Sequence, residues 1–356
     1  MNDELAEALE VLDSPAQQVR VRLDGYEVRL TSLDKVYWPA WGSRRALLKR
    51  DLLRYYLRIA PYVLPHLYDR PVTMRRFPMG LTGKRFYIRS PQEWAPAFVQ
   101  RFRAFTENSQ TDEEYFVCSN TATLVWLGQL GNLELHVAHT RVGAKPDAPH
   151  LGTTFVGSLA EVERSTLNYP DLLVIDLDPY IYSGNEPKGA EPELNPEGFS
   201  RAVEVALWFR EQLDGIGLHP FVKTTGKTGL HLYVPIARTL EFDAVRAVAE
   251  TLARQVLATQ PQVVTTEWTI SARRGKVFVD YNMNRRAASL AAPYSPRAVA
   301  WAGVSTPLEW NELGEVYPTQ FDLLNLPERL ARHGDVWAHL AVARVDVAQL
   351  VSAAGR

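Results

Sequence analysis

The stretch Asp171-Leu-Leu-Val-Ile-Asp176-Leu-Asp178, followed by Pro179, decides how the rest of this sequence is interpreted. Its apolar run lies between two prolines and ends in two carboxylates, a pattern that predicts a buried β-strand. Side chains alternate across a strand, so Asp176 and Asp178 point to the same face, about 6–7 Å apart. Two like charges there repel each other and lose hydration, and a divalent cation commonly compensates for both effects. The same residues also suit a turn, so this stretch alone leaves a metal site and a turn open.

The composition is that of a soluble globular protein, because 46% of the 356 residues are apolar and 22% are charged. This length is sufficient for two domains, or for one large domain with two lobes. The sequence has no run of eighteen apolar residues, so we expect no membrane span. The acidic N-terminus lacks the features of a signal peptide. Cys118 is the only cysteine, which excludes an internal disulfide and a cysteine-rich zinc site. We therefore expect a cytoplasmic protein without a membrane partner.

Positive charge is concentrated in the first third of the chain, although the formal net charge is only −2. Between Arg20 and Arg103 there are 18 lysines and arginines against 6 acidic residues, a surplus of twelve positive charges. The remainder is correspondingly acidic. Such an asymmetry indicates a lobe that contacts a polyanion such as DNA, and a basic solvated surface is the alternative.

Two basic clusters within that region are candidate DNA contacts. Arg44, Arg45, Lys49 and Arg50 precede a helix expected to run to Pro61, where free N–H groups and the helix dipole favour anions. A charged helix start without any ligand explains this stretch, taken alone, slightly better. In residues 71–90 basic and aromatic residues interleave, which suits phosphate contacts together with base stacking, or simple inside–outside patterning of a strand. The weaker DNA-binding candidates of this second cluster are Arg75, Arg76, Lys84, Arg85 and Phe86.

The order of elements in the C-terminal half predicts a β-α-β-β-α-β unit of the ferredoxin-like kind. In this topology the first strand is central and lies between the third and fourth strands. Asp176 and Asp178 then lie beside Asp280 on one neighbour and near His231 on the other. Three carboxylates from adjacent strands match a two-metal site, in which the ions sit about 3.5–4 Å apart, so Asp280 favours metal over turn. The predicted strands are 171–178, 220–223, 230–235 and 276–282, and the helices are 195–213 and 241–259.

Other segments are predicted less fully. Asp24-Gly25 joins two alternating runs, 19–23 and 26–30, as a hairpin, and 31–39 is expected to be a loop. A largely buried helix from Thr121 is expected to run into a strand at 133–137. We expect residues 140–170 to be loop-rich and mobile.

The turn at 224–229 is a candidate phosphate-binding site. Gly226 and Gly229 allow backbone N–H groups to approach an anion, and three side chains add donors: Thr225, Lys227 and Thr228. The spacing differs from that of a Walker A loop, and a strand follows the turn where a P-loop has a helix. Arg297 is a second candidate for a triphosphate contact. His136, on an apolar strand, is more typical of a buried core histidine than of a catalyst.

Taken together, these motifs resemble the archaeo-eukaryotic primase superfamily, in the branch of bacterial ligase D polymerase domains and their stand-alone relatives. The resemblance runs from about Val28 to Leu340. It implies an α+β primase-polymerase fold over 19–340, with a tail or helix at 1–18, a basic lobe at 19–165, a catalytic module at 166–310 and a helical tail at 311–356. The matching pieces are Asp34–Val36, Pro65–Leu67, Arg70-Pro71, Arg76–Pro78, Leu133–His136, Asp176–Pro179, Thr225-Gly226, Gly229–Tyr233, Val277–Tyr281, Pro293–Ser295 with Arg297, and Val304–Leu308.

The resemblance also implies roles for individual residues. Asp176, Asp178 and Asp280 match aspartates that hold two manganese or magnesium ions. The positions that match nucleotide-binding residues are Thr225 and His231 for the phosphates, Arg297 for the triphosphate and His136 near the sugar. Lys35 and Lys49 match lysines that bind a 5′-phosphate. The implied substrates are gapped or broken duplex DNA and NTPs or dNTPs, with ribonucleotides preferred, in gap filling, end joining or excision repair in the bacterial cytosol. An ATP-dependent ligase of the C or D type and Ku are the implied protein partners.

Three departures from the ligase D pattern point towards a stand-alone enzyme such as the ligase C-associated group. The lysine expected before Gly229 is replaced by Thr228, with Lys227 one position earlier. Met283 stands where many relatives carry arginine or glutamine, and four extra residues precede Lys49. Two other functions compete with a polymerase. A catalytically idle DNA-end-binding adaptor has no need of three converging carboxylates, and a nuclease lacks an assigned base that activates water.

Overall fold

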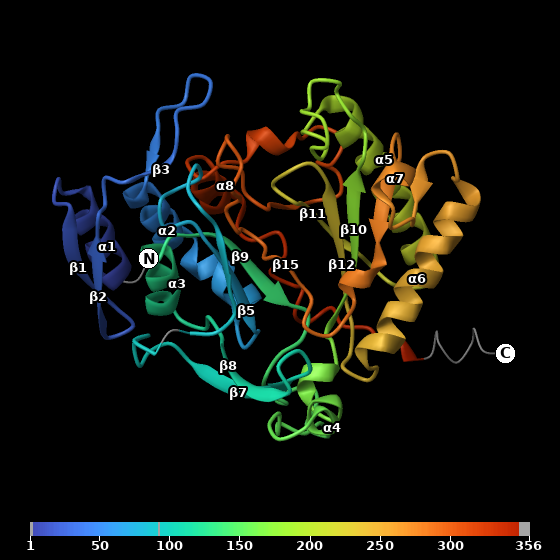
Figure 1. Ribbon diagram of the computed structural model, residues 1–356, viewed down its shortest axis with the longest axis horizontal. Helices are drawn as coiled ribbons and strands as arrows, with labels where there is room; N and C mark the ends of the chain where they lie inside the picture. Colours follow the sequence, from blue (N-terminus) through green and yellow to red (C-terminus); the bar gives the residue numbers. More distant parts are fainter. Residues whose placement is uncertain (1–2, 92, 349–356) are drawn as a thin grey trace.

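The computed structural model of the chain describes residues 3–91 and 93–348 (Figure 1). Within these residues the strands form a six-stranded sheet, a four-stranded sheet and three two-stranded sheets, together with helices. This confirms the α+β class. Figure 1 shows β5, β9 and β15 of the four-stranded sheet between the N-terminal elements and the six-stranded sheet.

The N-terminal segment folds as its local pattern predicts. Helix α1 (Asp3–Asp13) buries Leu5, Ala8 and Leu12. The strands β1 (Gln18–Leu23) and β2 (Tyr26–Thr31) form the predicted hairpin. Asp24 and Gly25 both have positive φ values, 51° and 79°, as a two-residue turn that matches strand twist requires. The expectation for residues 1 and 2 lies outside the described part of the chain.

The next segment corrects two predictions. The stretch expected to be a loop contains β3 (Val36–Trp38), which pairs with β4 (Leu47–Leu48). Helix α2 (Lys49–Leu67) does not stop at Pro61 but continues through Pro65. Proline in a helix interior removes a hydrogen bond and crowds the preceding turn. Burial of the last turns against the core outweighs that cost, since Val63 and Leu67 are fully buried.

The four-stranded sheet joins segments that are far apart in the sequence. Its order is β15 (Ser289–Ala291), β9 (Asn132–Ala138), β5 (Val72–Arg76) and β6 (Phe86–Ile88). Helix α3 (Thr121–Gln129) precedes β9 and ends before Gly131, whose φ is 85°. A separate hairpin of β7 (Arg101–Thr106) and β8 (Thr111–Phe116) lies beside this sheet (Figure 1). Pairing of β15 with β9 places the segment after Asp280 next to His136.

The six-stranded sheet contains the predicted β-α-β-β-α-β order. Its elements are β10 (Leu172–Pro179), α5 (Pro196–Gly215), β11 (Phe221–Thr224), β12 (Leu230–Pro235), α6 (Phe242–Thr259) and β14 (Val277–Asp280). Strand β10 lies between β12 and β14, as predicted. Two short strands that the sequence did not indicate extend its edges, β13 (Val264–Thr265) and β16 (Pro307–Leu308).

The two faces of β10 have different neighbours, and this decides where the carboxylates point. Leu173, Ile175 and Leu177 belong to the main hydrophobic core together with residues of α5 and α6, which pack against β10 (Figure 1). Leu172 and Val174 belong to a smaller cluster on the other face. Because side chains alternate, Asp176 and Asp178 continue this second face, away from the helices.

Shorter helices complete the described chain. They are α4 (Leu159–Glu163), η1 (Thr166–Asn168), α7 (Ile270–Arg273), η2 (Tyr281–Met283), η3 (Pro318–Gln320) and α8 (Leu326–His333). The predicted helical tail at 311–356 is therefore only partly helical, because Pro318 opens no more than one short turn and Gly334, with φ 70°, follows the end of α8. Residues 349–356 of that prediction lie outside the described residues. None of the described helices is long and apolar enough to cross a membrane.

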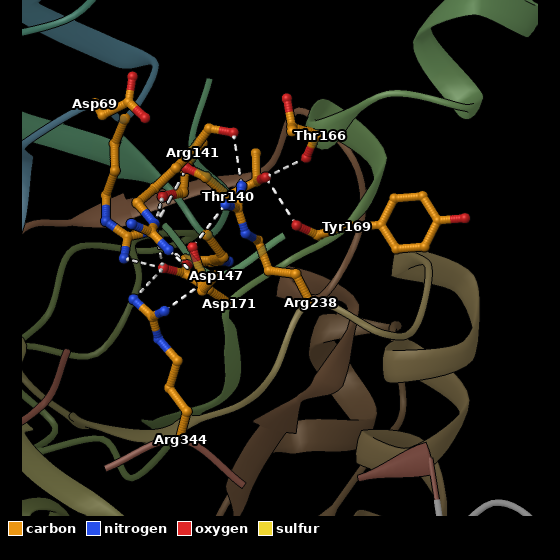
Figure 2. A network of polar contacts seen from close by, with 12 residues as sticks. Asp69, Thr140, Arg141, Asp147, Thr166, Tyr169, Asp171, Arg238 and Arg344 are labelled. Carbon is orange, nitrogen blue, oxygen red and sulfur yellow. Dashed lines mark hydrogen bonds and ion pairs between the residues drawn. The ribbon is translucent and has the colours of Figure 1, made fainter. Parts of the chain in front are cut away.

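Residues 140–170 are loop-rich, as predicted, but a buried polar network ties them to the rest of the molecule (Figure 2). Asp171 accepts two hydrogen bonds from Arg70, of 2.6 and 2.8 Å. Asp147 accepts from Arg238 at 2.8 Å and pairs with Arg141 and Arg344. These contacts argue against the mobility expected for the segment, because leaving any member of a buried ion network unpaired is costly. Arg344 extends the network to the C-terminal part of the chain.

Candidate active site

Strand register brings the three predicted aspartates together. Asp176 on β10 is the direct partner of Asp280 on β14 and, on its other side, of His231 on β12. Asp178 lies two residues further along β10, opposite Phe278. The predicted neighbourhood of these four side chains is thus the observed one. A catalytic role for them remains a prediction.

The carboxylates are electrostatically strained in this arrangement. Burial raises the pKa of Asp176 to about 6, and the cations Lys223 and Arg297 oppose that rise. Burial, aided by the negative charge of Asp176, raises the pKa of Asp280 to about 6. Burial and the charges of both other aspartates raise the pKa of Asp178 well above its usual range. The raised pKa values show that the ionised forms of these three aspartates lack enough positive charge nearby to stabilise them.

The donor chemistry of this cluster fits a divalent cation. Oδ1 of Asp176 lies 3.2 Å from Nε2 of His231, yet this buried oxygen receives no hydrogen bond. Carboxylate oxygens are the ligands that Mg²⁺ and Mn²⁺ prefer. In the described part of the chain no three aspartate, glutamate, histidine or cysteine side chains are already gathered as a metal-binding group. The three carboxylates therefore lie near one another without converging on a single point.

Glu134 is a central residue that the sequence did not single out. It is fully buried on β9, on the facing sheet. Its carboxylate pairs with Arg75 and lies 3.5 Å from both Nζ of Lys227 and Nε of Arg297. Burial alone raises its pKa, but Arg297, a hydrogen bond with His136 and Lys227 outweigh burial and hold the pKa well below the usual range. One buried carboxylate thus anchors cations from three distant segments.

His136 lies in the same cluster and not in an inert core. One of its ring nitrogens, Nε2, is 3.2 Å from Glu134. Burial lowers the pKa of His136 to about 4, although Glu134 opposes the shift. The ring is therefore neutral at neutral pH. Its position beside Glu134 places it with the candidate phosphate-binding cations, which the apolar pattern of its strand did not indicate.

Glycine is required twice in the turn between β11 and β12. Gly226 has φ 71°, and a Cβ there would lie 2.6 Å from the carbonyl carbon of Val304. A Cβ on Gly229 would lie 2.0 Å from the carbonyl oxygen of Leu177. Both approaches are closer than any real side chain tolerates. The turn is therefore pressed against neighbouring backbone, which explains both glycines without a ligand.

The donors of this turn are only partly available to an anion. The hydroxyl of Thr225 accepts hydrogen bonds from the backbone N–H groups of Lys227 and Gly229, at 3.1 and 3.2 Å. The predicted phosphate cradle of free backbone amides is thus filled by a side chain of the turn itself. Burial lowers the pKa of Lys227 to about 8. Arg297 donates to the Thr225 carbonyl oxygen, and Thr228 has no side-chain hydrogen bond to other described residues. The side chains of Lys227 and Arg297 remain the principal candidates for binding an anion.

A buried lysine behind His231 was also missed. Lys223 has no exposed surface. Its Nζ lies 2.7 Å from Nδ1 of His231 and 2.5 Å from Oγ of Ser305. Burial lowers the pKa of Lys223 well below its usual range, with the charge of Arg297 adding to that effect. A lysine next to a glycine turn reads as an exposed residue, so no sequence signal identified it.

A cavity of about 470 Å³ lies between residues of β5, β7 and the segment 285–289. Strand alternation places its floor residues Thr73 and Ala138 on the face that carries His136. Arg286 in its wall pairs with Glu107 and Glu163, whereas Arg285 has no ion pair with any described residue. Burial raises the pKa of Asp280, and the positive charge of Arg285 opposes that rise. Other lining residues are Arg89, Phe102 and Tyr115, the last two with stacked rings 5.5 Å apart.

Three basic residues of the N-terminal lobe lie together. Lys35 donates to the carbonyl oxygen of Pro78 at 3.1 Å, and Lys49 to that of Thr31 at 2.9 Å. Burial lowers the pKa of Lys49 to about 7, and the charges of Lys35 and Arg76 add to the shift. The structure thus joins Lys35 and Lys49, as the resemblance implies, and adds Arg76.

The rest of the predicted basic clusters is dispersed. Arg45 makes a bidentate ion pair with Asp51, with two contacts of 2.8 Å. Arg44 donates to the carbonyl oxygen of Ala300, and Arg50 is buried among carbonyl groups of the N-terminal segment. The arginines of the cluster before α2 are thus engaged within the protein, and an anion site formed by the whole cluster stays a prediction. Of the second cluster, Arg75 points inward to Glu134. Lys84, Arg85 and Phe86 are exposed.

Comparison with known proteins finds similarity over most of the chain. The family described as "LigD, primase-polymerase domain" matches residues 48–337. The multifunctional non-homologous end joining protein LigD of Mycolicibacterium smegmatis is 31% identical over 323 residues, which are 89% of this chain and 37% of that protein. The bifunctional non-homologous end joining protein LigD of Bacillus subtilis is 26% identical over 310 residues, 86% of this chain and 43% of that protein. The chain thus spans well under half the length of these relatives.

A solved structure shares the fold. It is described as the polymerase domain from Mycobacterium tuberculosis ligase D in complex with DNA. The superposition has a TM-score of 0.74 and 29% sequence identity, and it covers 89% of this chain and 99% of the other.

Proposed function

The chain belongs to the LigD primase-polymerase domain family, and from this premise we propose that it is a nucleotidyltransferase that extends a 3′-hydroxyl on gapped or broken DNA. The observation that carries the proposal is the register of Asp176 with Asp280 across β10 and β14, opposite a cation cluster anchored on Glu134. A cluster of acids facing a cluster of bases suits a metal-bound triphosphate, which presents both kinds of charge.

Asp176, Asp178 and Asp280 are the residues that hold divalent cations in this proposal, two ions of manganese or magnesium. When bound, such ions neutralise charge on the attacking 3′-oxygen and on the phosphates. The orphaned oxygen of Asp176 and the raised pKa values of all three aspartates support this assignment. In the reaction, the 3′-oxygen forms a bond to the α-phosphorus, and the bond from that phosphorus to the pyrophosphate oxygen breaks.

The facing cluster binds the nucleotide. Arg297 and Lys227 pair with the triphosphate, and His231 donates a hydrogen bond to it from the β12 side. His136 lies beside them and contacts the sugar. Glu134 holds the side chains of Arg297 and Lys227 in place before the nucleotide arrives, which reduces the entropy cost of binding.

The basic lobe binds the DNA in this proposal. Lys35, Lys49 and Arg76 form a pocket for a 5′-phosphate, because three mutually repelling cations gain most from a doubly charged anion. The growing strand reaches the aspartates along the 470 Å³ cavity, with its phosphates near Arg285 and its bases near Phe102 and Tyr115. The solved relative described as a DNA complex supports DNA as the substrate class.

The finer features of the proposal rest on the family. They are a preference for ribonucleotides, repair synthesis in gap filling, excision repair or end joining, and a place in the bacterial cytosol. The relatives described as end joining proteins support end joining. The protein partners proposed on the same ground are an ATP-dependent ligase of the C or D type and Ku.

The decisive experiment uses a 5′-phosphorylated gapped duplex, Mn²⁺ and labelled ATP or dATP. We expect extension by the native chain and none by Asp176→Asn, while both retard the duplex on a gel. Asp214→Asn, on the exposed end of α5, is the matched control and keeps full activity. Retardation without extension would instead identify an adaptor, and shortening of the labelled strand a nuclease.

A further inference from the structure

Lys223 occupies a position that the proposed reaction does not explain. It lies on β11 as the register partner of His231 on β12 and has no exposed surface. Burial of a lysine costs much free energy unless a carboxylate compensates for it. Within the described residues no carboxylate pairs with Lys223, whose Nζ contacts only neutral groups: Nδ1 of His231, Oγ of Ser305 and, at 5.6 Å, the ring of Tyr233. Because burying Lys223 costs free energy, we expect this lysine to have a function in the site.

The two nitrogens of the His231 ring face opposite chemical demands. Nε2 lies 3.2 Å from Oδ1 of Asp176, an oxygen that can only accept when ionised. Nδ1 lies 2.7 Å from Nζ of Lys223. A neutral imidazole carries a proton on one nitrogen and a lone pair on the other. The ring repels neither neighbour only when Nε2 carries the proton, towards the unbonded Oδ1 of Asp176, and Nδ1 is the acceptor.

We propose that Lys223 is a positioning residue that holds His231 in the tautomer with the proton on Nε2, so that this N–H points into the site beside Asp176. The proposal deepens the proposed function and rests on it only for what the N–H meets, the triphosphate of the incoming nucleotide. An ammonium group can only donate, which fixes Nδ1 of His231 as the acceptor. A neutral amine still has two N–H groups, one for Oγ of Ser305 and one for Nδ1, and the acceptor Oδ1 of Asp176 on the other side of the ring then favours the same tautomer.

The wrong tautomer has a clear cost. An unprotonated Nε2 directs its lone pair at a carboxylate or phosphate oxygen, so an attraction becomes a repulsion. Partners that orient the groups of a site from behind typically contribute about 10- to 100-fold to affinity or activity. We therefore expect Lys223→Met to raise the KM for the nucleotide about 10- to 100-fold. The KM for DNA should stay the same, because Lys223 lies on β11 behind His231 and away from the basic lobe.

The test that does not depend on activity is nitrogen NMR of the histidine rings in the full chain labelled with ¹⁵N-histidine. His231→Gln identifies the signals of His231 by their loss. In the native protein Nδ1 of His231 should resonate as an unprotonated nitrogen and Nε2 as a protonated one. In Lys223→Met, which preserves the length of the side chain but lacks its N–H groups, a population with protonated Nδ1 should appear.

Ser305→Ala is the matched control, since it removes the other hydrogen-bond partner of Lys223 and leaves the contact with His231. Its spectrum should retain the native tautomer. Protonated Nδ1 in the native protein, or an unchanged tautomer in Lys223→Met, would overturn the proposal. If Lys223→Met fails to fold, the native and Ser305→Ala spectra still decide. Absence of extension by the native chain, with the expected tautomer present, would reject the proposed function and leave this inference intact.

Discussion

Asp176 and Asp280 are direct partners in the antiparallel ladder between β10 and β14, so two carboxylates share one end of a buried sheet. The arrangement is unfavourable in the absence of a cation: burial, together with the charge of Asp176, raises the pKa of Asp280 to about 6. The fold thus bears an electrostatic cost at the place where the proposed chemistry occurs, and this relationship can be measured in several ways.

Removing one of these charges should stabilise the protein. The unfolded pKa of an aspartate is about 3.9, so the folded state binds more protons between pH 4 and 6 and stability falls as pH rises through that window. At pH 7.5, Asp280→Asn should increase the free energy of unfolding by about 1–3 kcal/mol. Asparagine can still accept the hydrogen bond from the N–H of Asn282. Urea unfolding at pH 7.5 and at lower pH tests this, and the gain should shrink towards pH 4. Equal stability of the two proteins at pH 7.5 would contradict the prediction.

Divalent cations should stabilise the native protein. Binding at a concentration of 100 times Kd adds about 2.7 kcal/mol to the free energy of unfolding. We expect Mn²⁺ to raise the melting temperature and EDTA to reverse the rise. Asp178→Asn should abolish most of this response, whereas Asp214→Asn, exposed on α5, should retain it. A full Mn²⁺ response in Asp178→Asn would place the cation elsewhere.

Glu134→Gln should destabilise the protein and weaken nucleotide binding. The substitution preserves shape but leaves Arg75, Arg297 and Lys227 without their shared counter-charge. Breaking a buried ion pair typically costs about 3–5 kcal/mol, which denaturant unfolding measures. Glu27→Gln is the control, because its pair with Arg20 is exposed and should change stability by less than about 1 kcal/mol. Equal effects of the two substitutions would show that the cluster needs no anchor.

Recognition of a 5′-phosphate should depend on pH through Lys49. The amine of Lys49 is charged below its pKa of about 7 and neutral above it, so the preference for phosphorylated over hydroxyl-ended DNA should weaken from pH 6.5 to 8.5. Lys49→Met should reduce that preference about tenfold at pH 6.5, the effect of one charge-assisted contact. Arg45→Ala is the matched control, because Asp51 already occupies that arginine. Fluorescence anisotropy with both kinds of DNA end measures this preference. A larger loss of the preference in Arg45→Ala than in Lys49→Met would contradict the prediction and indicate that the cluster before α2 binds the phosphate.

Arg285→Ala should affect the affinity for the primer strand, whereas Arg286→Ala should affect mainly stability. Arg285 is free in the cavity wall, so its loss should raise the KM for the primer strand several-fold and leave the KM for the nucleotide unchanged. Arg286 is engaged by Glu107 and Glu163, so its loss should affect stability more than strand affinity. Steady-state extension with varied primer and varied nucleotide separates the two. A change in the KM for the nucleotide in Arg285→Ala would contradict the placement of the growing strand in the cavity.

The features of this protein that could be predicted from the sequence are those that short-range residue patterns determine. The apolar run from Leu172 ending at Asp176 and Asp178 is a strand because of its own composition, and the alternation of that strand places both carboxylates on one face. The Asp24-Gly25 turn and the β-α-β-β-α-β order follow from the same kind of local signal. From that order the position of Asp280 beside Asp176 also follows, because the topology has few alternatives.

Tertiary structure alone decided which charged residues are available. Glu134 and Lys223 read as ordinary strand residues, and their burial depends on Arg75, Arg297 and Ser305, which come from other segments. Arg45 and Arg50 read as phosphate ligands, yet Asp51 and the N-terminal carbonyl groups occupy them. The physical reason is that burial and ion pairing are set by contacts between segments far apart in the chain, and these determine the energy of a charge. Sequence periodicity determines only which way a side chain points.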